Sequence, residues 1–307
     1  MKIIIAESED GQRVDFALAE LAGISRSQAQ RWIESDLVRV NGRSPRASSR
    51  VHCGDSLEAT PAEAVPSSVA PEAIPLSVLY EDDDLIVIDK PAGLVVHPAP
   101  GHPGGTLVNA LLHHCGDLAG VGGVLRPGIV HRLDQGTSGV MVAAKNDAAH
   151  RALSEQFRDH SIEREYRALV RALPGADTGR VDQPIGRHPR DRKRMSVHSR
   201  RGREASTVWR VVRRFRVTGR SWLAVLPESG RTHQIRVHLA SAGMPVVSDP
   251  VYGRSRREAL ALDHPALHAR ILGFDHPRTG ERLRFEAPLP DDLEQLIASL
   301  EAREESV

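Results

Sequence analysis

Apolar residues near the start of the chain recur at helical spacing, whereas farther on they gather in short runs rich in β-branched residues. The first set recurs every three or four positions and predicts an amphipathic helix, which Gly23 ends. This set consists of Val14, Ala17, Leu18 and Leu21. Ser25 and Gln28 then fit a capping box, which predicts a second helix beginning there. The residues expected to face inward from it are Ala29, Trp32 and Ile33.

A short alternating strand over residues 38–40 follows, and Asn41-Gly42 is a strong signal for a hairpin turn. Two short helices and a small sheet therefore predict a separate module over residues 1–60. Residues 61–75 are rich in Pro, Ala and Ser without periodicity, which predicts a semi-extended linker.

Beyond the linker, an acidic turn leads into a buried apolar strand from Leu85 to Ile88, which Pro91 ends. The central stretch from Arg126 to Asp147 reads as strand, turn and strand, because apolar runs flank a polar, glycine-containing turn. The further predicted elements are helices over 106–114, 150–160 and about 291–303, and a strand over 164–170.

Composition indicates the cellular compartment of the protein more clearly than its function. The chain has 307 residues, is 40% hydrophobic and carries a net charge of +1. Its two cysteines form no CxxC pair, which fits a reducing compartment. The N-terminus turns acidic at once, unlike a signal peptide, and no apolar run approaches a membrane span. We therefore expect a cytoplasmic protein that contacts no membrane. We expect no metal site at His113, His114 and Cys115, because adjacent ligands on one short segment rarely complete a tetrahedral site.

The basic residues are almost all arginine, and two regions offer candidate RNA contacts. All but four of the 41 basic residues are arginine, whose planar fork matches phosphate groups. Residues 187–203 form the most basic stretch and read as a long hairpin tip. Like charges repel each other, and RNA phosphates would relieve that repulsion. The candidate RNA contacts are Arg26, Arg31 and Arg43 in the module and Arg190, Arg192, Lys193 and Arg194 in the hairpin.

Asp134 is a candidate catalytic residue because it sits at the mouth of the central turn, two residues after Arg132. An aspartate before Gly-Thr-Ser-Gly is more often a turn residue that bonds its own backbone. The longer string HRLDQGTSGVMVAAK favours the catalytic interpretation, since it resembles the catalytic motif of the RluA/RluC/RluD-type large-subunit rRNA pseudouridine synthases. Gln135 and Gly136 stand where Lys-Asp is usual in that family.

Further strings resemble the same family in order and spacing. DDDLIVIDKPAGLVVHP is similar to the opening of its catalytic domain, and EREYRALV to the motif whose tyrosine stacks on the target uracil, which would be Tyr166. GRTHQIRVHLASAGMPVVSDPVYG resembles its third motif. There the resemblance implies that Arg231 pairs with the catalytic carboxylate and that Ile235 lines the floor of the pocket. Arg132 is placed as the wedge that fills the gap left by a flipped base.

The N-terminal module resembles the RNA-binding domain named after ribosomal protein S-four, on the strings SRSQAQRWIESDLVRVNG and CGD. The resemblance is closest to the RluD-like group, which carries this domain. It implies an α/β fold: a catalytic domain with a mixed, mostly antiparallel sheet over residues 76–290, a small α+β module at 1–60, and a C-terminal helix and tail at 291–307.

The activity implied is isomerisation of uridine to pseudouridine in large-subunit (23S) rRNA, by a monomer that needs no cofactor and no metal. The residues expected to act are Asp134, Tyr166 and Arg231. Two alternatives remain open. One is a non-catalytic RNA-binding ribosome assembly factor that uses the same basic surfaces. The other is a hydrolase that uses Asp134 on a nucleoside, for which no water-activating partner is apparent.

Overall fold

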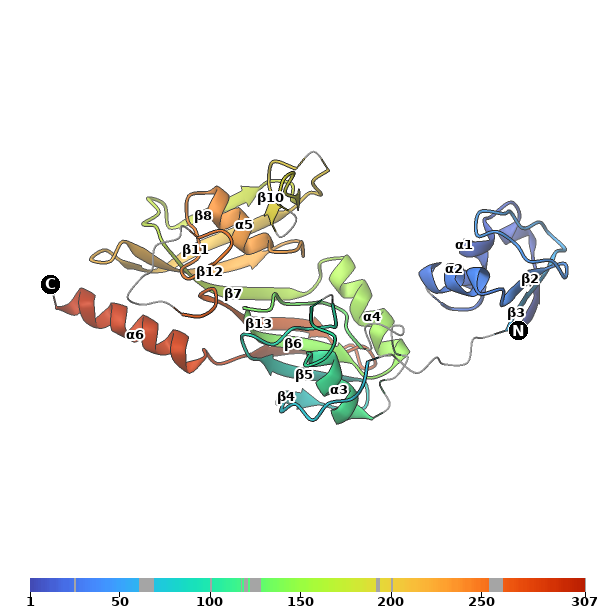
Figure 1. The fold of residues 1–307 in the computed structure, drawn as a ribbon, viewed down its shortest axis with the longest axis horizontal. Helices are drawn as coiled ribbons and strands as arrows, with labels where there is room; N and C mark the ends of the chain where they lie inside the picture. The colour runs from blue at the N-terminus through green and yellow to red at the C-terminus, as the bar shows by residue number, and fades with distance from the viewer. Residues whose placement is uncertain are drawn as a thin grey trace. The chain divides into compact units, whose positions relative to one another are not determined.

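Two compact units make up the chain in the computed structural model, Met1–Ser67 and Ser68–Val307 (Figure 1). The structure describes residues 1–24, 26–60, 69–99, 101–116, 118, 121, 128–191, 194–199, 201–253 and 262–306, and only the backbone of Ser27, Gln28 and Arg31. The predicted capping box therefore lies outside the described residues.

The first unit is a small α+β module. Its strands β1 (Lys2–Ile4), β3 (Ser56–Ala59) and β2 (Val38–Val40) pair antiparallel in that order. A 3-10 turn, η1 (Glu7–Glu9), and the helices α1 (Val14–Leu21) and α2 (Arg26–Glu34) complete it. The predicted inward residues pack in its core, with Ala29 and Ile33 buried. Asn41 and Gly42 both have positive φ, 49° and 76°, so the predicted two-residue turn is present.

The second unit is built on one nine-stranded sheet. Its strands are β4 (Ser77–Glu81), β5 (Leu85–Lys90), β6 (Ser138–Ala144), β7 (Glu163–Val170), β8 (Thr178–Asp182), β11 (Ser206–Phe215), β12 (Arg220–Pro227), β13 (Leu267–Asp275) and β14 (Arg282–Glu286). Its helices are α3 (Leu107–Cys115), α4 (Asp147–Arg158), α5 (Gln234–Ser241) and α6 (Asp291–Glu305). The strand order is β4-β5-β6-β13-β7-β12-β11-β8, with β14 also paired to β13.

Within this sheet, β13 pairs parallel with β6, and the other pairings are antiparallel, as predicted for a mixed sheet. Gly139 makes the parallel contact possible. Its φ is 116°, and a Cβ atom there would lie 2.1 Å from the Ala269 carbonyl oxygen. The approach to the central turn is shorter than predicted, since Ile129 forms only an isolated bridge with Ala143.

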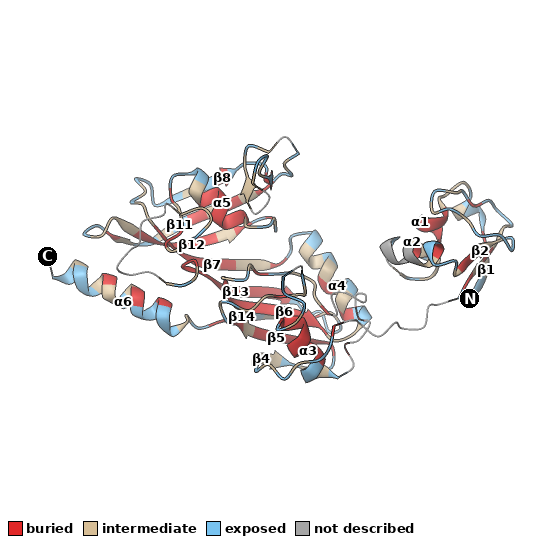
Figure 2. Ribbon diagram, viewed as in Figure 1, coloured by how far each residue is buried: buried red, intermediate tan, exposed pale blue. Residues whose placement is uncertain are grey.

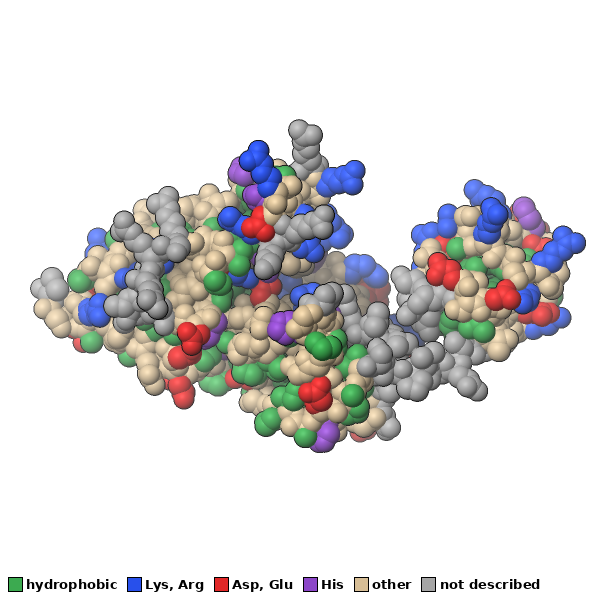
Figure 3. All heavy atoms as spheres, viewed as in Figure 1, with side chains coloured by type: hydrophobic (Ala, Val, Ile, Leu, Met, Phe, Trp, Pro, Cys, Tyr) green, Lys and Arg blue, Asp and Glu red, His purple; other side chains and the backbone are tan. Residues whose placement is uncertain are grey.

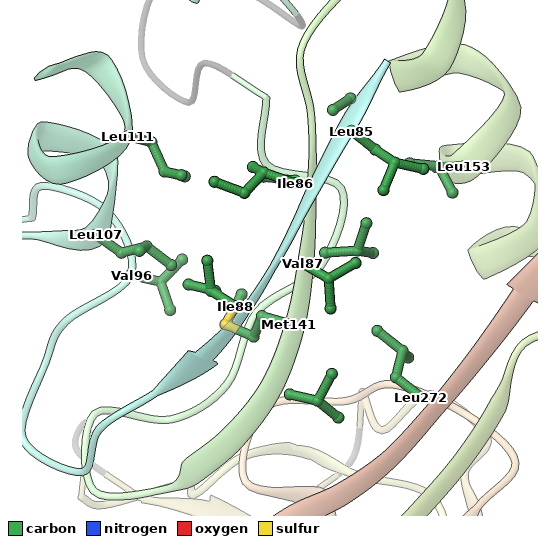
Figure 4. Close-up of a cluster of buried hydrophobic side chains, with 14 of the residues drawn as sticks. Leu85, Ile86, Val87, Ile88, Val96, Leu107, Leu111, Met141, Leu153 and Leu272 are labelled. Carbon is green, nitrogen blue, oxygen red and sulfur yellow. The ribbon is translucent and has the colours of Figure 1, made fainter. Parts of the chain in front are cut away.

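Two hydrophobic cores lie along the sheet, and its central strands are buried (Figure 2). In the first core, Ile86 and Ile88 of β5 lie toward α3, whereas Leu85 and Val87 lie on the other side, near Leu153 of α4 (Figure 4). The second core joins β7, β11 and β12 to α5 and α6. Tyr166 of β7 packs against both cores and so marks the boundary between them.

The second unit extends beyond the predicted catalytic domain at both ends. Val69, within the predicted linker, is buried in the first core, and the Asn109 side chain donates to the Ala70 carbonyl oxygen at 2.7 Å. At the other end, α6 buries Leu293 and Leu300 in the second core, so it is part of the unit rather than a tail. The Pro-, Ala- and Ser-rich run has no periodicity, which is why the sequence carries no signal for the contacts of Val69 and Ala70.

The basic stretch forms an excursion from the sheet. Strands β9 (Gly186–Arg187) and β10 (Met195–Ser196) pair antiparallel, and Ile185 bridges Arg203 at the base. We call residues 186–203 the basic hairpin. Figure 3 shows Lys and Arg side chains gathered around it. In the part of the chain that the structure describes, no helix is both long and apolar enough to span a membrane.

Candidate active site

The central turn holds Asp134 just before β6. The Thr137 amide donates to the Asp134 carbonyl oxygen at 3.0 Å, so the backbone closes a tight turn at this residue. His131 anchors the turn from the other side, because its Nε2 accepts from the Val142 amide at 3.0 Å and its ring stacks on Phe157. Burial, aided by the charge of Arg164, lowers the pKa of His131 to about 3, so the ring is neutral and free to accept that bond.

A buried lysine supports the turn from β5. The Lys90 ammonium is fully buried and donates to the carbonyl oxygens of Pro91, Leu94 and Gln135 at 2.7, 3.0 and 3.3 Å. Burial lowers its pKa to about 8, and the negative charges of Asp134 and Asp89 oppose that shift. Lys90 therefore fixes the backbone next to Asp134 and places a positive charge beneath it.

Arg236, in the first turn of α5, is the cation that holds the Asp134 side chain. Its Nη1 donates to Asp134 Oδ2 at 3.0 Å. Its Nε and Nη2 donate to the two oxygens of Asp249 at 2.7 and 2.9 Å. The Asp249 side chain is 0% exposed, so this forked pair sets the orientation of the guanidinium. Burial alone would lower the pKa of Arg236, but the hydrogen bonds and charges of both aspartates raise it above its usual value.

The predicted pairing of Arg231 with Asp134 is wrong. Arg231 Nε donates to the Glu204 carbonyl oxygen at 3.1 Å, and the ion pair with Asp134 belongs to Arg236. Arg231 precedes α5 in an irregular segment, whereas Arg236 projects from the helix. The motif contains two arginines five residues apart, and their spacing does not indicate which one the helix turns toward the carboxylate.

An open cavity of about 510 Å³ lies over this ion pair. It brings together the predicted site residues Arg132, Asp134, Tyr166, Arg231 and Ile235. Tyr166 is partly buried, and burial raises the pKa of its phenol, so the ring is neutral at ordinary pH. Ile235 is 5% exposed and lines the wall as an apolar surface. The cavity therefore presents a carboxylate, an aromatic ring and an apolar residue to one bound group.

Arg132 lies at the opening of this cavity. It is exposed, and its Nη1 lies 3.4 Å from His97 Nε2. A second cavity of about 510 Å³ shares Arg132 and Asp134 with the first. Arg132 thus stands between two hollows, which is a suitable place for a side chain that separates two nucleotides.

Several residues of the site were not predicted. Arg164 lines the first cavity, and its Nε is buried without a hydrogen-bond partner among the described residues. His233 has a left-handed backbone (φ 56°) just before α5, and its Nε2 lies 3.9 Å from Asp134 Oδ1. His233 and Arg236 are three residues apart at the start of a helix, and that spacing was the available signal. Asp249 and Tyr252 have no comparable spacing signal, because the residues that they contact are distant in the sequence.

The candidate RNA contacts differ in how far the structure describes them. Arg43 and Arg190 are exposed. Arg26 is half-exposed, and its Nε donates to the buried Asp15 at 3.0 Å. Arg194 is partly buried, with its guanidinium carbon 5.5 Å from the Tyr252 ring centroid. Arg192, Lys193 and the side chain of Arg31 lie outside the described residues.

A group of Asp82, Asp84 and His276 brings three possible ligand atoms within 4.8 Å of one another. These atoms already serve the fold. His276 Nε2 bonds Asp82 Oδ2 at 2.8 Å, and Arg278 Nη2 donates to Asp84 Oδ1 at 2.7 Å. We therefore interpret the group as a hydrogen-bonded corner of the sheet.

Comparison with known proteins gives two family matches. The model described as RNA pseudouridylate synthase matches residues 84–241, which include the Asp134 turn and Arg236. The model of the S4 domain matches residues 12–57.

Relatives match over nearly the whole chain. An uncharacterised RNA pseudouridine synthase of Bacillus subtilis is 45% identical over 299 residues, covering 97% of each chain. Proteins named ribosomal large subunit pseudouridine synthase D are 42% identical in Zymomonas mobilis, covering 97% of each chain, and 44% identical in Xanthomonas campestris, covering 99% of this chain and 92% of that protein.

Among solved structures, human RNA pseudouridylate synthase domain containing 4 is similar with a TM-score of 0.58 and 26% identity. The similarity covers 73% of this chain and 93% of that one. It agrees with the mixed, mostly antiparallel sheet of the second unit.

Proposed function

Because the chain belongs to the RNA pseudouridylate synthase family, we propose that Asp134 is the catalytic carboxylate with which it isomerises uridine to pseudouridine in large-subunit rRNA. The observation that carries the proposal is the Asp134–Arg236 ion pair at the edge of the cavity. An rRNA substrate also implies the cytoplasmic location expected from the sequence.

The reaction has simple requirements. The bond between N1 of uracil and C1′ of the ribose breaks, the base turns, and C5 bonds to C1′. C5 loses a proton and N1 gains one, so atoms and electrons balance without an oxidant, a reductant or water. The protein must therefore reach the base, hold an ionised carboxylate beside it and keep it in place while it turns.

The geometry supports Asp134 in the carboxylate role. Arg236 occupies Oδ2, while Oδ1 lies 3.9 Å from His233 Nε2, which is beyond hydrogen-bond distance. A carboxylate reacts as a nucleophile or base only when it is ionised, and a fixed guanidinium favours the ionised form. The Asp249 fork prevents Arg236 from turning away, so the ion pair is preorganised before substrate arrives.

The other cavity residues suit the handling of a flipped base. Flipping a base out of a stacked helix costs a few kcal/mol. We propose that Tyr166 stacks on the uracil, that Ile235 forms the apolar wall and that Arg132 fills the gap in the RNA. The Tyr166 phenol remains protonated at ordinary pH, so it also offers a hydrogen-bond donor.

RNA binding would come from the first unit, Met1–Ser67, which matches the S4 domain and which we call the S4 unit, and from the basic hairpin. We propose that Arg26, Arg31 and Arg43 contact the backbone in the first, and that Arg190, Arg192, Lys193 and Arg194 do so in the second. The choice of large-subunit rRNA is supported by the relatives named ribosomal large subunit pseudouridine synthase D, which match nearly the full chain, S4 unit included.

The test is Asp134→Asn, which keeps the shape and removes the charge. Pseudouridine formation in unmodified large-subunit rRNA should fall more than 100-fold, while RNA affinity stays within a few fold. The matched control is Asp177→Asn, an exposed aspartate paired with Arg214, which should behave as wild type. Turnover by the Asp134→Asn variant above one-hundredth of wild type would remove Asp134 from the catalytic role.

The same assay separates the alternatives. An RNA-binding assembly factor would bind the rRNA with strong salt dependence and form no pseudouridine. A nucleoside hydrolase would release free uracil, which chromatography detects. Only an isomerase forms pseudouridine while it leaves the chain length and the base count of the RNA unchanged.

A further inference from the structure

Tyr252 lies between the basic hairpin and the catalytic ion pair. Its backbone amide donates to Asp249 Oδ1 at 3.0 Å, and that carboxylate also holds the Arg236 guanidinium. The Arg236 guanidinium carbon lies 5.2 Å from the centroid of the Tyr252 ring. One carboxylate and one ring contact therefore fix Tyr252 and Arg236 relative to each other.

The hydroxyl of Tyr252 reaches the hairpin on one side and the active site on the other. It accepts a hydrogen bond from the Met195 amide of β10 at 2.8 Å and lies 2.9 Å from His233 Nδ1. A phenol has one proton to give. Because its oxygen already accepts from Met195, the arrangement that uses both contacts has the hydroxyl donating to Nδ1 of His233.

That donation sets the form of His233. Burial lowers the pKa of this imidazole, although the charge of Asp134 opposes the shift, so the neutral ring predominates near pH 7. A neutral imidazole that accepts at Nδ1 carries its proton on Nε2. Nε2 is the nitrogen that lies 3.9 Å from Asp134 Oδ1, so the hydroxyl of Tyr252 directs a donor toward the side of the carboxylate that Arg236 does not occupy.

The hairpin packs against the Tyr252 segment and α5 at this point. Met195 and Val197 of the hairpin pack with Tyr252 against buried Ile185 and Val237. The guanidinium carbon of Arg194 lies 5.5 Å from the same Tyr252 ring centroid. A change in the position of β10 would thus move the amide that orients the Tyr252 hydroxyl.

We propose that Tyr252 is a positioning residue that couples RNA bound on the basic hairpin to the arrangement of His233 and Arg236 around Asp134. RNA phosphates on the hairpin hold β10 in place. The Met195 amide then holds the Tyr252 hydroxyl toward His233, and the ring keeps Arg236 against Asp134. The inference rests on the proposed catalytic role of Asp134.

The first experiment is Tyr252→Phe, which keeps the ring and removes the hydroxyl. With unmodified large-subunit rRNA at saturation, the single-turnover rate, followed as tritium released from C5-labelled uridine, should fall about tenfold. The dissociation constant for the RNA should stay within twofold. Tyr80→Phe is the matched control, since it removes a hydroxyl bonded to Asp82 on the far edge of the sheet, and its rate should equal that of wild type.

The second experiment observes the tautomer directly. In protein with ¹⁵N-labelled histidine, two-dimensional NMR should show His233 protonated at Nε2 in wild type and as a mixture of tautomers in Tyr252→Phe. A residue that only supports the fold would lower the melting temperature without altering this spectrum. An unchanged tautomer in folded Tyr252→Phe protein overturns the proposal, and this measurement does not depend on activity.

The third experiment tests the coupling itself. Arg190→Gln with Arg201→Gln removes two exposed hairpin charges, and at saturating RNA it should slow turnover severalfold in the wild-type background. Added to Tyr252→Phe, the pair should slow it by less than twofold, because the path is already broken. Multiplicative losses overturn the proposal. So does the absence of any effect of the Arg190 and Arg201 pair alone at saturation, a result that needs no Tyr252 variant to fold.

These experiments distinguish a failure of the proposed role of Asp134 from a failure of the proposed role of Tyr252. If wild type forms no pseudouridine, or Asp134→Asn remains active, the proposed function fails, while the tautomer measurement still decides whether Tyr252 sets the form of His233. If wild type is active and Asp134→Asn is not, the Tyr252 results bear on the coupling alone.

Discussion

Asp15 in the S4 unit and Asp134 in the catalytic unit both stand two residues after an arginine, but the structure uses the two carboxylates differently. Arg13 donates to both oxygens of Asp15, at 2.9 and 3.0 Å. Arg26 and Gln30 add bonds of 3.0 and 2.7 Å, and the side chain is 0% exposed. The Asp15 carboxylate therefore accepts four hydrogen bonds from described residues of the module.

At Asp134 the preceding arginine does not form the pair. Arg132 extends toward His97, and Arg236, which is 102 residues away, donates to one oxygen of a side chain that is 19% exposed. The same spacing of arginine and aspartate thus gives a buried carboxylate with four hydrogen bonds in one unit. In the other unit it gives a partly exposed carboxylate at the edge of a cavity. The two carboxylates therefore differ in how many of their hydrogen-bonding positions are occupied by the protein.

The largest expected effect comes from breaking the pair at Asp134. Arg236→Met removes one partner of a buried pair, a change that typically costs about 3–5 kcal/mol. Because Asp134 also loses the cation that holds its carboxylate in place, turnover at neutral pH should fall at least about 100-fold. Arg236→Lys should retain a fraction, because it restores the charge without the fork. Single-turnover rates, with circular dichroism to confirm folding, make the measurement.

Arg231→Met is the matched control, because Arg231 lies in the same motif and bonds the Glu204 carbonyl oxygen instead. We expect its rate to stay within about tenfold of wild type. If Arg231→Met is inactive and Arg236→Met is not, the Asp134–Arg236 ion pair is not the one that supports catalysis.

Breaking the cluster at Asp15 should have a smaller effect and one of a different kind. Asp15→Asn removes the charge that holds two partly exposed arginines, so we expect a loss of about 1–2 kcal/mol in the stability of the S4 unit. Turnover at saturating RNA should remain near that of wild type. Amide hydrogen exchange of residues 1–60 in the full chain, compared between wild type and Asp15→Asn, measures the loss. A stable unit with an inactive enzyme would contradict the comparison.

The pH dependence follows from the same cluster. The hydrogen bond from Arg13 holds the pKa of Asp15 well below its usual value of about 3.9. A group whose folded pKa is depressed stabilises the fold above its unfolded pKa. This contribution should be fully present at neutral pH and be lost as pH falls below about 4. Asp15→Asn should therefore flatten the dependence of S4-unit stability on pH in that range.

The sequence predicted the local elements well because period and turn residues are local signals. The two short helices, the Asn41-Gly42 turn and the buried strand β5 each depend on neighbouring residues. The order of strands in the sheet does not, since β6 pairs with β13, more than a hundred residues away. The mixed sheet was expected only through resemblance to a family.

The site shows the same limit. Asp134 and Tyr166 were recognised from their motifs, and the structure brings both to one cavity. The partner of Asp134 was misassigned because Arg231 and Arg236 are indistinguishable as letters in one motif. The helix boundary at Gln234 decides between them, and it depends on the left-handed backbone at His233. Asp249 could not be found at all, because its importance lies in holding an arginine from another element.

The smallest expected effect concerns exposed arginines compared with arginines already paired. In the S4 unit, Arg43 is exposed, whereas Arg39 donates to both oxygens of Asp36 at 2.6 and 2.7 Å. Each phosphate that a protein neutralises on a duplex adds about 0.9 to the steepness of log K against log salt concentration. Arg43→Gln should therefore flatten the slope by about that amount, as measured by binding to large-subunit rRNA across a salt series.

Arg39→Gln is the control for this prediction, because its charge is already neutralised by Asp36 and its donors are used within the unit. Its slope should equal that of wild type. Equal slopes for wild type and Arg43→Gln would show that exposure alone does not identify an RNA contact in this unit. A flatter slope for Arg39→Gln would show that RNA displaces Asp36 from Arg39. Arginines that are paired with a carboxylate in the free protein would then also contact RNA, and pairing would not identify a purely structural residue on the surface.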